Sequence, residues 1–150
     1  MKEIVSDAQN FLNRIFETTG LSLRASAEAT ATDYLFEIVG EDVALLRNEG
    51  GEVLDALDHL INQIFGRALA KGERFVCDVQ GYRATRDAEL RMMARHAAER
   101  VRATGQTFTF GPMSASERRV IHLALADAAD LHTESVGFGE SRRLSVSRKK

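Results

Sequence analysis

The chain has 150 residues, of which 44% are hydrophobic and 28% are charged, and its formal net charge is −2. These values are typical of a soluble globular protein with one ordinary domain or two small ones. No apolar run approaches the roughly 18 to 20 residues of a membrane-spanning helix, and the N-terminal sequence lacks the apolar stretch of a secretory signal. The single cysteine, Cys77, excludes an intramolecular disulfide. We therefore expect a cytoplasmic protein without membrane insertion, in which Cys77 is a small buried hydrophobe.

The first half of the chain predicts a helix, two strands, a helical turn, a glycine loop, a long helix and a buried strand. The expected elements are a helix capped by Ser6 or Asp7 and ended by Gly20, strands at 21–30 and 32–40, a turn at 43–47, a helix at 52–70 and a strand at 75–79. The long helix has the widest apolar face, formed by Val53, Leu54, Leu57, Leu60, Ile61, Ile64, Phe65 and Leu69.

Gly81 is a plausible hinge, after which a second set of elements begins. The expected elements are a helix at 82–104, a short strand at 107–110, a helix that ends near Ala128, and a hairpin formed by 133–139 and 142–147. The buried stripe of the first of these helices is expected to be Leu90, Met93, Ala94, Ala97 and Val101. Ser114 and Glu117 have the spacing of a capping box at the start of the second.

Charge is divided unevenly between the two halves. Residues 1–82 hold 7 basic and 14 acidic side chains, a net charge of −7, whereas residues 83–150 hold 13 basic and 8 acidic ones, a net charge of +5. This difference suggests two units with different partners, and the basic unit is the better candidate for binding nucleic acid.

Arg118 and His122 are the first candidate functional residues. They are four residues apart on a predicted helix, so they lie one above the other on the same face. An exposed arginine can hold a phosphate by charge, and a histidine one turn later can contact a sugar or a base. The pair alone is weak evidence, because Arg-x-x-x-His occurs by chance in many helices.

The residues around this pair resemble a known family. P-M-S-A-S-E-R-R-V-I-H-L-A-L-A-D followed by T-E-S-V-G-F-G-E-S-R-R-L-S-V closely resembles the Arg-x-x-x-His domain of the Jag family, the bacterial SpoIIIJ-associated proteins, also called KhpB or EloR. D-V-Q-G-Y-R-A-T-R-D resembles the junction between the two domains of that family. L-D-A-L-D-H-L-I-N-Q-I-F resembles the helix after the glycine loop of its KH domain.

The resemblance implies an α+β protein with a KH domain of type II topology at 1–81, in which helices pack on a three-stranded sheet, followed by a small α+β Arg-x-x-x-His domain at 82–150. It also implies binding of single-stranded RNA, or DNA, in the cytoplasm, and a regulatory role in cell elongation, division or sporulation. Some members pair with a small KH-only protein. Larger members carry an additional N-terminal domain, and the chain is expected to begin directly at the KH domain.

The glycine loop departs from the family pattern. A KH domain holds about four nucleotides with a Gly-x-x-Gly loop that is often basic at its middle positions. The matching residues are Asn48, Glu49, Gly50 and Gly51. Asn48 tolerates a left-handed backbone, but Glu49 would repel a phosphate by about 1 kcal/mol at 4 Å in water. The KH domain either has lost RNA contact and serves as a scaffold or protein interface, or binds through backbone N–H groups and an adjacent apolar groove.

On either interpretation the basic second half is expected to provide most of the affinity for nucleic acid. Arg118 and His122 would be central, and the expected phosphate contacts are Arg119, Arg142, Arg143, Arg83 and Arg86. Glu117 is expected to cap its helix rather than to contact a ligand.

The sequence predicts neither an enzyme nor a metal site, and no cofactor. His59, His96, His122 and His132 form no His-x-x-x-His pattern, and no Cys-x-x-Cys pair, phosphate-loop lysine motif or nucleophile elbow is present. The alternative function is that of a protein-interaction adaptor whose KH domain dimerises or docks a partner. Salt distinguishes the two functions, because the affinity of phosphate contacts falls steeply with ionic strength.

Overall fold

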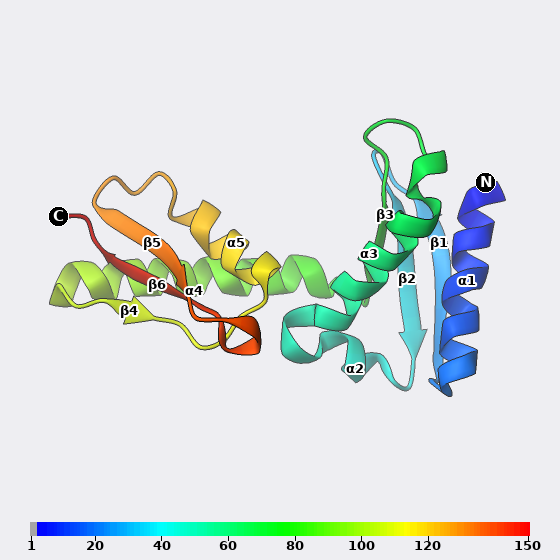
Figure 1. Cartoon of the computed structure of the whole chain (residues 1–150), viewed down its shortest axis with the longest axis horizontal. Helices are drawn as coiled ribbons and strands as arrows, with labels where there is room; N and C mark the ends of the chain where they lie inside the picture. The colour runs from blue at the N-terminus through cyan, green and yellow to red at the C-terminus, as the bar shows by residue number, and fades with distance from the viewer. Residues whose placement is uncertain (1–2) are drawn as a thin grey trace. The chain divides into compact units, whose positions relative to one another are not determined.

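The structure is a computed structural model that describes residues 3–150. It divides into a first unit that ends at Arg83 and a second unit, Ala84–Lys150 (Figure 1). Each unit contains one three-stranded sheet packed with helices, so the chain is an α+β protein, as predicted. No helix among residues 3–150 is both long and apolar enough to cross a lipid bilayer. The assignment of KH and Arg-x-x-x-His domains to 1–81 and 82–150 stays a prediction.

The first unit has the element order helix, strand, strand, helix, helix, strand. Its elements are α1 (Glu3–Thr19), β1 (Leu23–Ala29), β2 (Tyr34–Gly40), α2 (Val43–Arg47), the 3₁₀ turn η1 (Asn48–Gly51), α3 (Glu52–Phe65), the 3₁₀ turn η2 (Gly66–Ala68) and β3 (Phe75–Asp78). The sheet order is β1-β2-β3. β1 pairs antiparallel with β2, and β2 pairs parallel with β3 after the crossover that contains α2 and α3.

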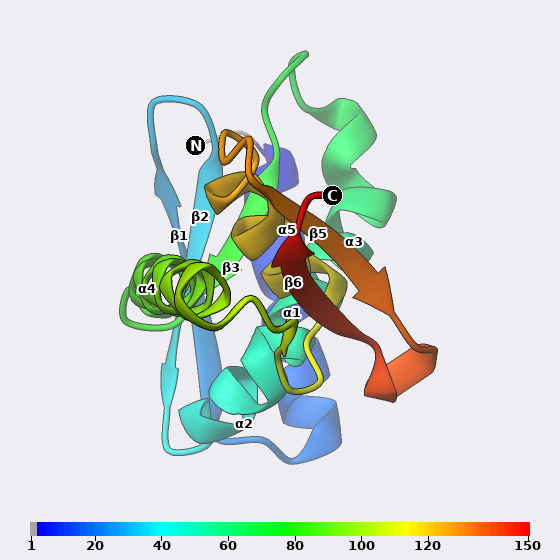
Figure 2. The ribbon, with the colours of Figure 1, turned by 90° about the vertical axis from the view of Figure 1, so that its left-hand side faces the viewer.

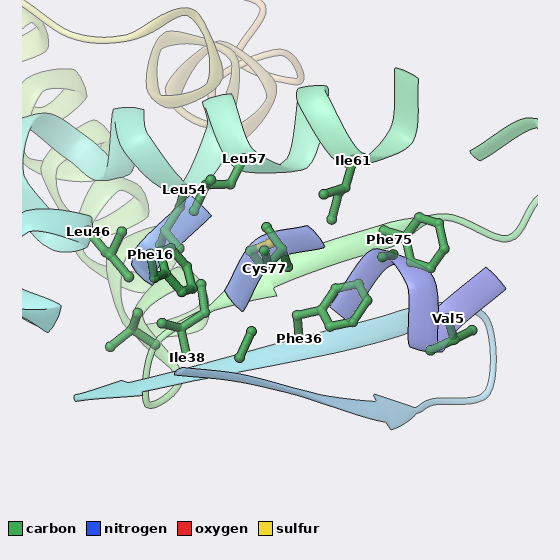
Figure 3. Packing of buried hydrophobic residues seen from close by; sticks show 14 residues of the cluster. Val5, Phe16, Phe36, Ile38, Leu46, Leu54, Leu57, Ile61, Phe75 and Cys77 are labelled. Carbon is green, nitrogen blue, oxygen red and sulfur yellow. The ribbon is translucent and has the colours of Figure 1, made fainter. Parts of the chain in front are cut away.

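The core of the first unit lies between one face of this sheet and the helices. Alternate strand residues point inward, including Phe36 and Ile38 from β2 and Phe75 and Cys77 from β3. α1 and α3 cover that face (Figures 1 and 2). Figure 3 shows the strand side chains meeting the inward residues of α3, among them Ile61. Cys77 is fully buried, which confirms the prediction made for it.

Helix side chains cover the outer edges of both edge strands. On β1, Asn13 bonds both the N–H and the C=O of Ala25 at 2.8 and 3.1 Å, and Gln9 accepts the N–H of Ala27. On β3, Asn62 bonds the N–H and C=O of Phe75 at 2.9 and 2.8 Å. Because these backbone groups are paired within the unit, they are not available for pairing with a strand of another chain.

Two predicted helix boundaries in the first unit are wrong. α1 already includes Glu3, so Ser6 and Asp7 lie inside the helix and not at its cap. α3 ends at Phe65 and is followed by a 3₁₀ turn, whereas the apolar pattern predicted a helix to residue 70. Asn62, one turn before that end, bonds β3 with its side chain, so the packing on β3 and not the apolar period sets where this helix ends.

The second unit combines two helices with a second sheet. Its elements are α4 (Tyr82–Thr104), whose first turn belongs to the first unit, β4 (Phe108–Thr109), α5 (Ala115–Ala124), β5 (Leu131–Val136), the 3₁₀ turn η3 (Gly139–Ser141) and β6 (Arg143–Arg148). The sheet order is β4-β6-β5, with both pairs antiparallel. The predicted closing hairpin is therefore confirmed as β5 and β6, and β5 is an edge strand.

The core of the second unit is formed by one side of α4, by α5 and by the inward residues of the sheet. Its buried members are Leu90, Ala94, Ala97, Ala98, Val101, Phe110, Ile121, Leu125, Leu131, Leu144 and Val146. Of the predicted α4 stripe, Met93 is only half-buried. Ser114 caps α5 as predicted, because its Oγ accepts the N–H of Glu117. α5 ends at Ala124 and not near Ala128, since residues 125–128 form tight turns that lead into β5.

Candidate nucleic-acid interface

An open hollow lies between α5 and the edge strand β5. It has a volume of about 460 Å³, and its lining residues are Ala115, Ser116, Arg118, Arg119, His122, Ser135 and Leu144. Arg118 and His122, which the sequence places on one helical face, both line it. Arg119 is on the exposed side of the helix and forms part of the rim.

Arg118 is held by neutral acceptors. It is half-buried, and its Nη1 donates to the Ser135 hydroxyl at 2.9 Å, whereas its Nε donates to the carbonyl of Met113 at 3.4 Å. The guanidinium is therefore oriented by the protein without being neutralised by it. An arginine in this state presents its remaining N–H groups and its full charge to a ligand.

His122 is oriented by the same strand. The Thr133 hydroxyl lies 2.5 Å from Nδ1 of His122, which is otherwise exposed. Within residues 3–150, Nε2 of His122 has no hydrogen-bond partner. Thr133 and Ser135 are two residues apart on β5, so both hydroxyls point to the α5 side of the sheet. The pair of hydroxyls fixes the pair of cationic or polar side chains opposite them.

The hollow is bordered by arginines without carboxylate partners. Arg142 donates to the carbonyl of Gly137, and Arg143 donates to that of Ser141. As far as residues 3–150 go, none of Arg118, Arg119, Arg142 and Arg143 forms an ion pair. A phosphate would supply the anionic partner that these side chains lack, with charge-assisted hydrogen bonds.

Arg83 is placed differently, inside the first unit. Its two terminal nitrogens bind Asp55 and Asp58 at 2.8 and 2.9 Å, and its Nε donates to the carbonyl of Cys77 at 2.8 Å. Burial raises the pKa of Asp58, although Arg83 opposes that effect. Burial also raises the pKa of the Cys77 thiol. A phosphate would have to displace two carboxylates from Arg83, so this residue carries less weight as a contact.

Arg86 joins α4 to α5 by an ion pair. Its Nε donates to Glu117 at 2.7 Å and its Nη1 to Glu89 at 3.1 Å. Glu117 is only 6% exposed, so its carboxylate is a structural partner of Arg86 in addition to its place in the capping box. The sequence predicted the cap for Glu117 but not this ion pair, which also reduces the weight of Arg86 as a phosphate contact.

The glycine loop has an unusual backbone. Glu49, Gly50 and Gly51 are all left-handed, with φ of 51°, 68° and 77°, whereas Asn48 is extended with φ of −65°. The expectation that Asn48 uses its tolerance of the left-handed region is thus wrong, and Glu49 takes that conformation instead. A side chain at Gly51 would meet the Tyr82 ring at 2.9 Å, so packing as well as φ requires glycine there.

The electrostatics of the loop remain acidic in the structure. Glu49 and Glu52 are both exposed beside the loop. Arg47, the nearest basic residue in sequence, donates to the side-chain oxygen of Gln80 at 2.5 Å. A phosphate at the loop would therefore meet two carboxylates and an arginine that is already engaged.

The other histidines do not form a metal centre. His96 is exposed and contacts the Phe108 ring edge-on, with centroids 6.5 Å apart, and His132 lies 3.3 Å from Glu134. Within the described part of the chain, no group of three or more His, Cys, Asp or Glu side chains is arranged to hold a metal ion.

Sequence reasoning missed Thr133 and Ser135. Their signal was present, because hydroxyl residues alternate in T-E-S on a predicted strand. What the sequence lacked was the pairing of that strand with the helix face of Arg118 and His122, which are 17 and 11 residues away from their partners. Such long-range contacts follow from the fold and not from local spacing.

Comparison with known proteins places this hollow in a recognised module. Residues 88–148, which include Arg118, His122 and Ser135, match the family model of the Arg-x-x-x-His domain. The chain is 28% identical to RNA-binding protein KhpB of Clostridium symbiosum over 152 aligned residues, covering 99% of this chain and 68% of that protein. It is 29% identical to RNA-binding protein KhpB of Bacillus subtilis over 148 residues, covering 97% and 71%. A third relative, RNA-binding protein KhpB of Lactiplantibacillus plantarum, is 33% identical over 106 residues, covering 71% and 33%.

Proposed function

We propose that the chain binds single-stranded RNA through the hollow between α5 and β5. The observation that carries this proposal is the pair of Arg118 and His122, which line one hollow and are oriented by neutral hydroxyls rather than by carboxylates. The names of three similar proteins, each an RNA-binding protein KhpB, support RNA as the ligand. The second unit holds 12 basic and 8 acidic residues, a net charge of +4, which favours an anionic partner.

Each side chain of the hollow has a distinct part in this proposal. Arg118 donates its free guanidinium N–H groups to a phosphate, because Ser135 and the Met113 carbonyl occupy only part of its donors. His122 presents Nε2 to a phosphate, a ribose hydroxyl or a base edge. Arg119, Arg142 and Arg143 surround the hollow and attract the backbone electrostatically. Arg83 and Arg86 contribute mainly through their ion pairs with carboxylates.

We infer further that the first unit is a KH domain of type II topology at about 1–81. The order helix, strand, strand, helix, helix, strand, with β2 and β3 parallel, supports this inference. The glycine turn before α3 has the position of the nucleic-acid loop of such a domain. Its exposed Glu49 and Glu52 favour a loop that has weak RNA contact. A cytoplasmic role in cell elongation, division or sporulation rests on the family resemblance.

One observation favours the second candidate function, that of a protein-interaction adaptor. Val53, Leu60 and Ile64 form a stripe along α3, and they are 40%, 39% and 49% exposed. The spacings of seven and four residues place them on one side of the helix. A continuous apolar stripe outside the core is typical of a protein interface. The adaptor function would use this stripe for a second copy of the chain or for a small partner.

Fluorescence anisotropy with a labelled, unstructured RNA of about 15 nucleotides tests the principal proposal. We expect wild-type binding to weaken with salt, at a log–log slope of about −0.7 for each neutralised phosphate. The double variant Arg118→Ala/His122→Ala should lose at least about 10-fold in affinity, because it removes a charged and a neutral contact. Circular dichroism should confirm that the variant keeps its helices.

Arg95→Ala is the matched control for the loss of one positive charge. Arg95 is exposed on α4 in the same unit and does not line the hollow. It should change affinity by no more than about 2-fold. Equal losses in the control and in the double variant would point to diffuse charge, and unchanged binding in the double variant would contradict the proposed site.

A further inference from the structure

Phe138 is an aromatic side chain that the core of the second unit does not use. It is 88% exposed, more than any of the other exposed large hydrophobic side chains of the described residues. It lies in the connection of residues 137–142 between β5 and β6. A single exposed hydrophobic residue is common on protein surfaces, so exposure alone carries no conclusion. The structure of the connection and its place beside the hollow give the residue its meaning.

The connection holds the backbone of Phe138 in one conformation. The Phe138 carbonyl accepts hydrogen bonds from the Oγ and the N–H of Ser141 at 2.8 and 3.3 Å. Gly137 has φ of 90°, and a Cβ there would lie 3.3 Å from the Ser141 carbonyl. The Arg142 side chain donates to the Gly137 carbonyl at 3.1 Å. The ring therefore projects from a braced turn, and little backbone entropy would be lost when a ligand contacts it.

The same connection is attached to the border of the hollow. The N–H of Met113 donates to the carbonyl of Arg142, and the carbonyl of Met113 accepts from Nε of Arg118. Ser135, which lines the hollow, precedes Phe138 by three residues, a span of at most about 11 Å along the chain. A ligand that occupies the hollow thus has Phe138 within reach of its neighbouring parts.

The side chains around Phe138 favour one class of ligand. Arg142 and Arg143 follow it, Glu140 is the one acidic residue of the turn, and the rest of the turn is glycine and serine. A lipid surface or a protein interface buries a contiguous apolar patch, which this turn does not offer. A single flat ring beside arginines is the arrangement that binds single-stranded nucleic acid, by stacking on a base while the cations hold the backbone.

We propose that Phe138 stacks on an unpaired base of the RNA strand whose phosphate lies at Arg118. This inference rests on the proposed function of the hollow and extends the site from a phosphate contact to a contact with the base. Stacking on one ring does not require a particular base, because every base has a π-face. Phe138 therefore contributes affinity for unpaired nucleotides and not for a defined sequence.

The test compares Phe138→Ala, Phe138→Leu and Phe138→Tyr in the full chain, with the anisotropy assay and the RNA of about 15 nucleotides. Phe138→Ala and Phe138→Leu should both weaken binding by about 5- to 100-fold, since base stacking contributes that much per residue. Phe138→Tyr should bind as wild type does. The salt slope should be unchanged in all three, because no charge is altered. Leu123→Ala is the control, since Leu123 is 60% exposed on α5 and does not line the hollow.

The outcomes separate this inference from the proposed function. Salt-dependent binding by wild type with an equal affinity of Phe138→Ala would overturn the stacking and leave RNA binding intact. Full affinity in Phe138→Leu would also overturn it, because an apolar contact without a π-face would then suffice. Absence of wild-type binding at low salt would contradict the proposed function itself.

Discussion

At the scale of single residues, the hydrogen bonds of the charged side chains distinguish those that bind from those that brace. Arg118 bonds a hydroxyl and a carbonyl, whereas Arg83 bonds Asp55 and Asp58, and Arg102 bonds Asp130 at 2.7 and 2.9 Å. The second kind of arginine has its charge neutralised within the fold. Arg102 accordingly lowers the pKa of Asp130 to about 2. Net charge alone does not separate these two groups, because each arginine contributes equally to it.

The buried carboxyl of Asp58 leads to a prediction about pH. Burial raises its pKa above the ordinary value of 3.8, so the folded state holds the proton more tightly than the unfolded state does. Stability that depends on this group is present below pH 3.8 and is lost as pH rises through the raised pKa. The free energy of unfolding of wild type, relative to Asp58→Asn, should therefore fall between about pH 3.5 and about pH 7.

Tyrosine fluorescence during urea unfolding measures this difference in the first unit alone. The chain has no tryptophan and only two tyrosines, Tyr34 and Tyr82, which both precede the end of that unit at Arg83. Asp7→Asn is the matched control, since Asp7 is exposed on α1. A difference that stays constant over this pH range, or that grows with pH, would show that burial does not raise the pKa of Asp58.

At the scale of elements, α3 carries two functions of its apolar face. Leu54, Leu57 and Ile61 are buried in the core (Figure 3), whereas Val53, Leu60 and Ile64 remain outside it. The edges of the sheet are covered by Asn13 and Asn62, so the α3 stripe is the better candidate for contact with another chain. An interface of this kind depends on apolar burial and responds little to salt.

The adaptor function predicts that the chain self-associates through this stripe. Wild type should show a mass above 16.6 kDa in light scattering at high concentration, and Leu60→Arg should shift it towards 16.6 kDa. The reason is that a buried, unpaired arginine is strongly unfavourable in an apolar interface. Gln63→Arg adds the same charge at an exposed position on the same helix and should leave the mass unchanged. A wild-type mass of 16.6 kDa at all concentrations would contradict self-association.

The sequence predicted the elements better than the contacts between them. The strand pattern, the Ser114 cap and the order of helices followed from period and capping rules, and the structure has each of them. The end of α5 did not follow, because L-A-L-A-D-A-A-D favours helix while the chain has to turn into β5. The partners of Arg83 and Arg86 were equally inaccessible, since they lie 25 to 31 residues away in sequence.

At the scale of the whole molecule, the two units divide the charge and the types of surface. The first unit has 8 basic and 14 acidic residues, a net charge of −6, an acidic glycine loop and an apolar stripe on α3. The second has a net charge of +4 and a hollow bordered by arginines that, within residues 3–150, have no carboxylate partner. We infer that RNA affinity belongs mainly to the second unit, and contact with other proteins to the first.

An RNA titration followed by amide chemical shifts tests this division most directly, and a chain of 16.6 kDa suits the method. The probe is the unstructured RNA of about 15 nucleotides, added to the full ¹⁵N-labelled chain. We predict that the largest shift changes occur between Arg118 and His122 and at Ser135, with small changes at Asn48–Gly51. The largest changes at Asn48–Gly51, with none around Arg118, would contradict the account and place RNA binding at the glycine loop.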